Sequence, residues 1–127
     1  MRIIGITAFL AMSSMTWPAH SEGIPNPLVG RSYEQKLSET RWWTMKVEPA
    51  QLTFVAMAGE KKGQVVLTVP NPIVTEVSED VYLLRWQEEN KATAVHVINL
   101  KRGIEYFSAT RPDGTFVMLE GTVKEVR

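Results

Sequence analysis

The C-terminal half of the chain, residues 81–126, constrains the fold most strongly. It contains four consecutive apolar-rich runs separated by short polar turns, at residues 81–88, 93–100, 104–109 and 116–126. Runs of this length and spacing predict an antiparallel meander. Such a meander closes most readily into a barrel, and a small barrel encloses either a packed core or one small ligand.

The first half adds five shorter strand candidates. They lie at residues 29–37, 42–47, 51–58, 65–69 and 73–77. The loop at 59–63 has glycine at both ends, which suits a hairpin, whereas Pro70-Asn71-Pro72 breaks the ladder. Because no run of helical length repeats its apolar residues every 3.6 positions, the sequence predicts an all-β fold. The expected architecture is a small closed antiparallel β-barrel of eight or nine strands.

The N-terminus has the features of an export signal. Arg2 precedes an apolar run at residues 3–12, and the small residues Ala19 and Ser21 predict cleavage after Ser21. A membrane-anchoring helix is the alternative, but the run is shorter than the roughly 20 residues that span a bilayer. We therefore expect a signal peptide at 1–21, an extended leader at 22–28 and a barrel domain at 29–127. The mature form would be exported, periplasmic and free of the membrane.

Composition excludes several classes of function. The 127 residues carry 14 basic and 14 acidic side chains and no cysteine. A neutral chain with scattered lysines and arginines lacks the basic patch of a nucleic-acid-binding protein. The lack of cysteine excludes disulfides and thiolate metal sites. The sequence predicts no nucleic-acid partner, no metal and no cofactor.

Turn symmetry predicts which side chains share a face. We expect the pairs Trp86–Ala94, Leu84–His96, Tyr82–Ile98, Ile98–Phe107, Leu100–Glu105 and Phe107–Glu120. One face would then carry Tyr82, Leu84, Trp86, His96, Ile98, Phe107, Met118 and Glu120. The other would carry Leu83, Arg85, Val95, Val97, Tyr106, Leu119 and Val123. Neither face is cleanly polar, so the aromatic face is assigned to the lumen, with tight core packing as the alternative.

Few side chains suggest catalysis. His96 is the one histidine left after signal cleavage, and a hydrogen-bonded core histidine explains it better than a zinc ligand, which needs further partners. Glu105 and Glu120 could form an acid–base pair, although glutamates near strand ends are usually solvated. The doublet Trp42-Trp43 places one ring inside and the other at the rim, where it could gate a pocket.

Four segments resemble the MoaF-like (molybdenum cofactor biosynthesis protein F) family. They are Leu28-Val29-Gly30-Arg31-Ser32-Tyr33, Val81-Tyr82-Leu83-Leu84-Arg85-Trp86-Gln87-Glu88, Val95-His96-Val97-Ile98-Asn99-Leu100 with Gly103, and Leu119-Glu120-Gly121-Thr122-Val123. The resemblance implies a lipocalin-like, or calycin, barrel with a central cavity. Phenolic acid decarboxylases are related barrels, and Glu88 would match their catalytic glutamate. Their two tyrosine positions fall on Gln35 and Leu37 and their arginine position on Gln64, so decarboxylation ranks last.

The predicted function is the binding of a small apolar or aromatic molecule in the barrel, without catalysis. The expected ligand-binding residues are Tyr33, Tyr82, Leu84, Trp86, Glu88, His96, Phe107 and Glu120. The alternative is a structural or assembly module that forms a homodimer, or docks a protein partner, through its outer apolar face.

Overall fold

The structure, a computed structural model, describes residues 26–127. The predicted signal peptide and most of the leader lie outside the described residues. The described residues form nine strands: β1 Ser32–Lys36, β2 Trp42–Glu48, β3 Gln51–Ala56, β4 Val65–Pro70, β5 Ile73–Ser78, β6 Val81–Gln87, β7 Thr93–Asn99, β8 Ile104–Thr110 and β9 Phe116–Val126. The predictions of an all-β fold and of eight or nine strands are confirmed. Within residues 26–127, no helix has the length and apolar character needed to cross a membrane.

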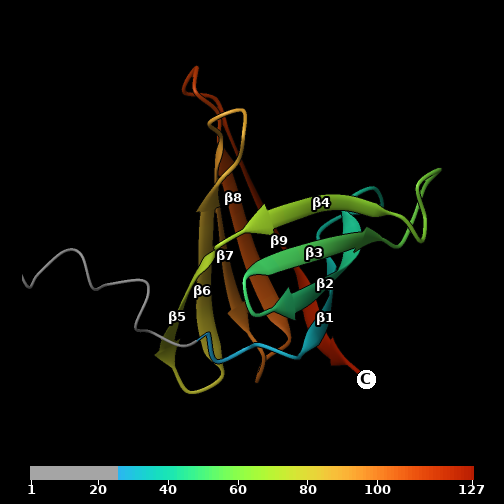
Figure 1. Cartoon of the computed structure of the whole chain (residues 1–127), viewed down its shortest axis with the longest axis vertical. Coiled ribbons are helices and arrows are strands. Elements are labelled where there is room, and N and C mark those ends of the chain that lie inside the picture. Colours follow the sequence, from blue (N-terminus) through green and yellow to red (C-terminus); the bar gives the residue numbers. More distant parts are fainter. Residues whose placement is uncertain (1–25) are drawn as a thin grey trace, which may run out of the picture.

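All nine strands belong to one antiparallel sheet in the order β4-β3-β2-β1-β9-β8-β7-β6-β5. The last strand, β9, pairs with the first, β1, so the two ends of the meander are joined. The two edges are β4 and β5, which follow each other in the sequence. Figure 1 shows β2–β4 running across the direction of β5–β8, as a strongly curled sheet requires. The molecule is therefore a half-barrel, and the prediction of a closed barrel is wrong.

The opening between β4 and β5 follows from the residues that join them. Pro70 ends β4 and Pro72 precedes β5, and neither has a backbone N–H to donate to a ladder. Asn71 between them has a φ of 49°, and its N–H donates to the carbonyl of Ala50. No hairpin ladder can start at this junction, as the sequence predicted.

At the opposite side of the sheet, the joint between β1 and β9 depends on Gly121. A Cβ at this position would lie 2.2 Å from the carbonyl oxygen of Lys36 and 2.8 Å from Cα of Leu37. Both atoms belong to backbone, which cannot move aside as the end of a side chain can. Only glycine lets β9 approach β1 this closely.

Alternate residues of each strand point into the curled sheet and form one core. Leu28, which the sequence assigned to the leader, is fully buried in it. The buried hydrophobic cluster comprises Leu28, Tyr33, Met45, Val47, Leu52, Phe54, Val69, Val74, Tyr82, Leu84, Trp86, Ala94, Ile98 and Val123.

The predicted register is right for one hairpin and shifted by two residues in the next. Between β6 and β7, the structure confirms the pairs Trp86–Ala94, Leu84–His96 and Tyr82–Ile98. Between β7 and β8, Ile98 faces Glu105 rather than Phe107. The loop between them has four residues, because Asn99 accepts hydrogen bonds from Gly103 N through its carbonyl and from Arg102 N through its side chain. A two-residue shift keeps the same face inward.

The last hairpin is shifted by one residue, which reverses the faces of β9. Phe107 faces Leu119, and Tyr106 faces Glu120. Met118 and Glu120 therefore point outward, while Leu119 and Val123 lie on the inner face, contrary to the prediction. The cause is a five-residue loop at 111–115 in place of a two-residue turn. Asp113 Oδ1 accepts hydrogen bonds from the N–H and the hydroxyl of Thr115, which stabilises this wider loop.

Candidate functional site

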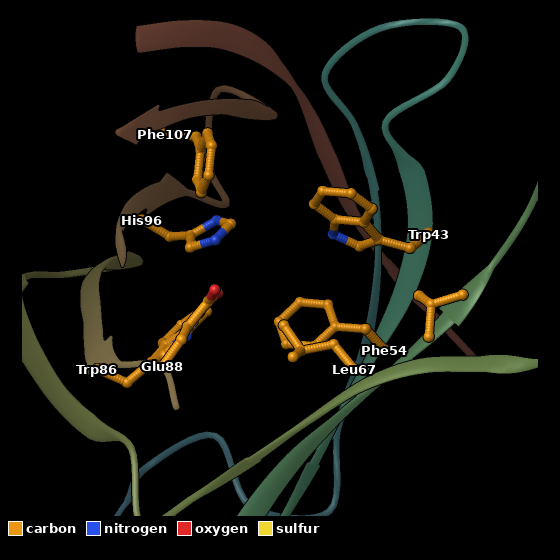
Figure 2. A pocket seen from close by; sticks show the side chains of 8 residues that line it. Trp43, Phe54, Leu67, Trp86, Glu88, His96 and Phe107 are labelled. Carbon is orange, nitrogen blue, oxygen red and sulfur yellow. Dashed lines mark hydrogen bonds between the residues drawn. The ribbon is translucent and has the colours of Figure 1, made fainter. Parts of the chain in front are cut away.

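A cavity of about 90 Å³ lies inside the half-barrel, between its two walls. One wall is formed by β2, β3 and β4, and the other by β6, β7 and β8 with the residue that follows β6. The lining residues are Trp43, Phe54, Val66, Leu67, Trp86, Glu88, His96 and Phe107. Figure 2 shows the two groups of side chains facing each other across the cavity. Almost all of the lining is apolar, so the site can take the carbon surface of a ligand.

Aromatic contacts hold the lining in place. Phe54 meets Trp43 edge to face, with ring centroids 5.8 Å apart, and lies 5.8 Å from Trp86. On the other wall, the His96 ring stacks on Trp86, with centroids 5.1 Å apart and an interplanar angle of 18°. The Phe107 ring also packs against His96, with centroids 4.7 Å apart. Offset and edge-to-face pairs of this kind add about 0.5–1.5 kcal/mol each beyond their buried area. The rings therefore form a preformed site.

The polar groups of the cavity centre on His96. Its Nδ1 lies 2.5 Å from Oε2 of Glu105, a short contact between two groups that are only 1% and 0% exposed. The other carboxylate oxygen, Oε1, is buried without a hydrogen-bond partner in the described part of the chain. Figure 2 shows the imidazole of His96 projecting into the space between the walls. Glu105 thus fixes the ring from behind, and the ring lines the cavity.

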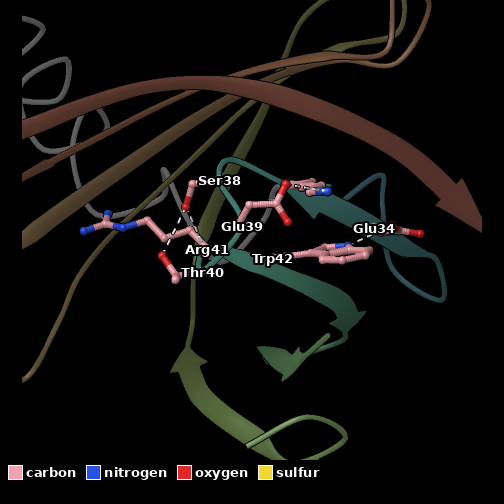
Figure 3. A network of polar contacts seen from close by, with 7 residues as sticks. Glu34, Ser38, Glu39, Thr40, Arg41 and Trp42 are labelled. Atoms are coloured by element: carbon pink, nitrogen blue, oxygen red, sulfur yellow. Dashed lines mark hydrogen bonds and ion pairs between the residues drawn. The ribbon is translucent and has the colours of Figure 1, made fainter. Parts of the chain in front are cut away.

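The doublet Trp42-Trp43 places one ring on each side of the sheet. Trp43 lines the cavity and donates from Nε1 to Oε1 of the buried Gln35 at 2.7 Å. Trp42 lies outside, where its Nε1 donates to Glu34 at 2.8 Å (Figure 3). Lys36 Nζ lies 4.3 Å from the centroid of the same ring. Both rings are partly exposed, and each is held by a polar partner on β1.

The tight turn between β1 and β2 sets this arrangement. Its hydrogen bonds join Arg41 N to Ser38 Oγ at 2.9 Å and Ser38 Oγ to Thr40 Oγ1 at 3.3 Å, as Figure 3 shows. Lys36 also pairs with Glu39 at 3.2 Å. The turn aligns Gln35 with Trp43, so that the second tryptophan faces inward.

Four of the eight predicted site residues line the cavity: Trp86, Glu88, His96 and Phe107. Leu84 and Tyr82 point inward from the same strand but are buried in the core, away from the lining. Tyr33, also predicted to bind the ligand, is fully buried in the core instead. Glu120 points outward and is exposed, so its placement in the lumen is wrong.

The other half of the lining, Trp43, Phe54, Val66 and Leu67, was not among the predicted site residues. The signal for two of them was present, because the alternation of Leu52, Phe54 and Ala56 marks an inward face and the tryptophan doublet guarantees one inward ring. Sequence spacing cannot show that β3 and β4 lie opposite β6–β8, since these walls do not pair with each other.

Two further buried polar groups lie in the interior. Gln35 Nε2 and the Tyr33 hydroxyl find no hydrogen-bond partner among residues 26–127. Burial raises the pKa of the Tyr33 phenol, and the nearby guanidinium of Arg31 opposes this effect. The described residues contain no group of three or more His, Cys, Asp or Glu side chains that could hold a metal ion.

The outer face of β7, β8 and β9 carries a second, shallower hollow of about 380 Å³. Val95, Val97, Tyr106 and Met118 line it beside Glu120. Met118 is 71% exposed and Tyr106 is 48% exposed. This outer face is apolar and open to solvent.

The fold and the cavity define a small antiparallel half-barrel with an aromatic internal site. The sequence model of the MoaF-like family matches residues 29–124, and the chain belongs to this family, as its sequence motifs indicated. No protein of curated function matches the chain. Among solved structures, it is similar to a crystal structure from Burkholderia vietnamiensis provisionally described as a beta-lactamase. The TM-score is 0.68 at 21% identity, with 81% of this chain and 99% of the other covered.

Proposed function

We propose that this chain is an exported small-molecule-binding protein, which holds one small apolar or aromatic molecule inside its half-barrel in the manner of lipocalin-type barrels. The observation that supports this proposal is the cavity between the two walls, lined by five aromatic or imidazole rings that are already in contact with one another. Burial of ligand carbon against these rings supplies the affinity. The proposal includes no chemical step.

The size of the cavity limits the ligand. Ligand sites usually measure roughly 300–1,000 Å³, and an engineered cavity of about 150 Å³ takes up benzene. A cavity of about 90 Å³ that opens to solvent therefore holds part of one ring, with the rest in its mouth. For a ligand of this size we expect a Kd on the order of 10 μM to 1 mM.

Calorimetric titration of the protein with α-methylstyrene, a one-ring hydrocarbon, tests the proposal. We expect saturable binding at one site. Val66→Trp should abolish binding by filling the cavity, whereas Val65→Trp, the same change at the neighbouring exposed residue outside the lining, should not. Equal binding by both variants, or none by the unmodified protein, would contradict the proposal.

Export rests on the N-terminal sequence and has its own test. After expression of the full chain in a Gram-negative bacterium, N-terminal sequencing of the periplasmic fraction should begin at Glu22. A cytoplasmic product that retains residues 1–21 would contradict export.

The exposed outer face supports a second candidate function, assembly into a homodimer. Tyr106 of β8 and Met118 of β9 lie on this face, and Val95 and Val97 of β7 line it beside them. Sedimentation equilibrium should then detect a dimer that Met118→Lys disrupts. A monomer at millimolar concentration would exclude this role.

Two enzymatic interpretations find less support. The relative described as a beta-lactamase shares only the fold at its level of identity, and this chain contains no Ser-x-x-Lys sequence for a serine nucleophile. A decarboxylase would need a cation near its glutamate, but Arg85 is exposed. Glu88 instead lies at the cavity, where its Oε2 accepts a 3.5 Å hydrogen bond from Trp86 Nε1.

A further inference from the structure

The buried pair of His96 and Glu105 determines which polar group the cavity offers to a ligand. The two side chains are 1% and 0% exposed, and no described lysine or arginine forms an ion pair with either of them. A net charge buried to this extent would carry a large desolvation cost. The pair is therefore neutral as a unit.

Three arrangements of protons make the pair neutral. One of them places the acid proton on Oε1 of Glu105 and leaves Nε2 of His96 unprotonated, but Oε1 is buried without a hydrogen-bond partner among residues 26–127, so this O–H would be an unsatisfied donor. Two arrangements remain. In one, the imidazolium donates from Nδ1 to the carboxylate. In the other, the carboxylic acid of Glu105 donates to an unprotonated Nδ1. Both arrangements leave a hydrogen on Nε2 of His96. The position of the proton between Nδ1 and Oε2 therefore does not change the group that His96 presents to the cavity, which is Nε2–H.

Nε2 has no hydrogen bond to any residue among 26–127, while the ring that carries it lines the cavity. Around it the lining is almost wholly apolar, so a ligand group that accepts this hydrogen bond gains a partner that the site otherwise lacks. Glu88, at the same cavity, adds a carboxylate that repels anions. These two side chains favour an acceptor and disfavour a negative charge.

We infer that the cavity selects uncharged one-ring aromatic molecules carrying a carbonyl or similar acceptor, with His96 Nε2–H as donor and Glu88 excluding aromatic carboxylates. This inference rests on the proposed binding function and names the ligand class. His96 and Glu88 are its specificity-determining residues.

The test compares two ligands of nearly the same shape, acetophenone and α-methylstyrene, which differ by C=O against C=CH₂. Because removal of one partner of a buried pair endangers folding, the variant is the double substitution His96→Phe/Glu105→Leu. We expect this change to weaken acetophenone binding about tenfold more than α-methylstyrene binding, because only acetophenone loses a hydrogen bond at a buried acceptor.

Each outcome separates the ligand class from the binding function. Equal effects of the variant on both ligands would overturn the donor role of His96 while leaving cavity binding intact. Failure of both ligands to bind the unmodified protein would overturn the binding function together with this inference.

The exclusion of aromatic carboxylates by Glu88 is tested on the same protein with benzoate. We expect benzoate to bind more weakly than acetophenone, and Glu88→Gln to strengthen benzoate binding several-fold more than acetophenone binding. No gain of benzoate binding in Glu88→Gln would overturn the role of Glu88. Matched far-UV circular dichroism spectra establish that the variants are folded.

Discussion

Replacing Glu105 by leucine removes one partner of a fully buried pair and leaves Nδ1 of His96 without a hydrogen bond. Because the two side chains are 0% and 1% exposed, water cannot replace the lost partner. Breaking a buried pair in this way costs about 3–5 kcal/mol, whereas exchange of both partners for apolar residues of similar volume is often neutral. Against a total stability of about 5–15 kcal/mol, the single variant loses a large share.

Urea unfolding, followed by tryptophan fluorescence and circular dichroism, measures these differences. At about 4–8 °C per kcal/mol for a domain of this size, Glu105→Leu should also lower Tm by about 12 °C or more. The double variant His96→Phe/Glu105→Leu should recover most of the loss. Glu120→Leu, an exposed position on the neighbouring strand, should stay within about 0.5 kcal/mol. The reasoning is refuted if the double variant is as unstable as the single one, or if Glu105→Leu matches Glu120→Leu.

Three further changes test separate features of the molecule. Gly121→Ala places a methyl group 2.2 Å from the Lys36 carbonyl, so it should cost about 1–3 kcal/mol in urea unfolding, and a neutral result would contradict the close joint of β1 and β9. Phe54→Ala should cost about 3–5 kcal/mol, while Phe116→Ala, 64% exposed, should cost about 0.5 kcal/mol or less. Tyr33 has a pKa raised by burial, so its contribution to stability is present below the unfolded pKa near 10 and is lost as pH rises through the folded value. Tyr33→Phe should remove this alkaline loss, and an unchanged pH profile of unfolding would show that Tyr33 does not cause it.

The strand count was predictable because each strand carries its own local pattern. The run at residues 51–58 was predicted as a strand, and Pro70 with Pro72 marked the break in the ladder. The same prolines explain why β4 and β5 stay unpaired edges and the barrel is not closed. Both effects depend on a few neighbouring residues, which is why the sequence contains them.

The failures in the site have a different origin. Glu120 was placed inside because the Asp113-Gly114 pair predicted a two-residue turn, whereas the hydrogen bonds from Thr115 to Asp113 widen the loop to five residues. This one-residue shift in register moves the carboxylate of Glu120 from the lumen to solvent. Trp43 was missed as a lining residue because the walls β2–β4 and β6–β8 share no hydrogen bonds, so strand register does not show that they face each other.

The central claim is that an accessible apolar cavity lies between the wall of Trp43 and Phe54 and the wall of Trp86 and His96, beside the contact of Phe54 with Trp86. A crystal structure determined under xenon pressure tests it directly, since xenon enters apolar cavities of this kind. The account predicts a xenon atom between these four side chains. A crystal structure without xenon in this cavity would contradict it.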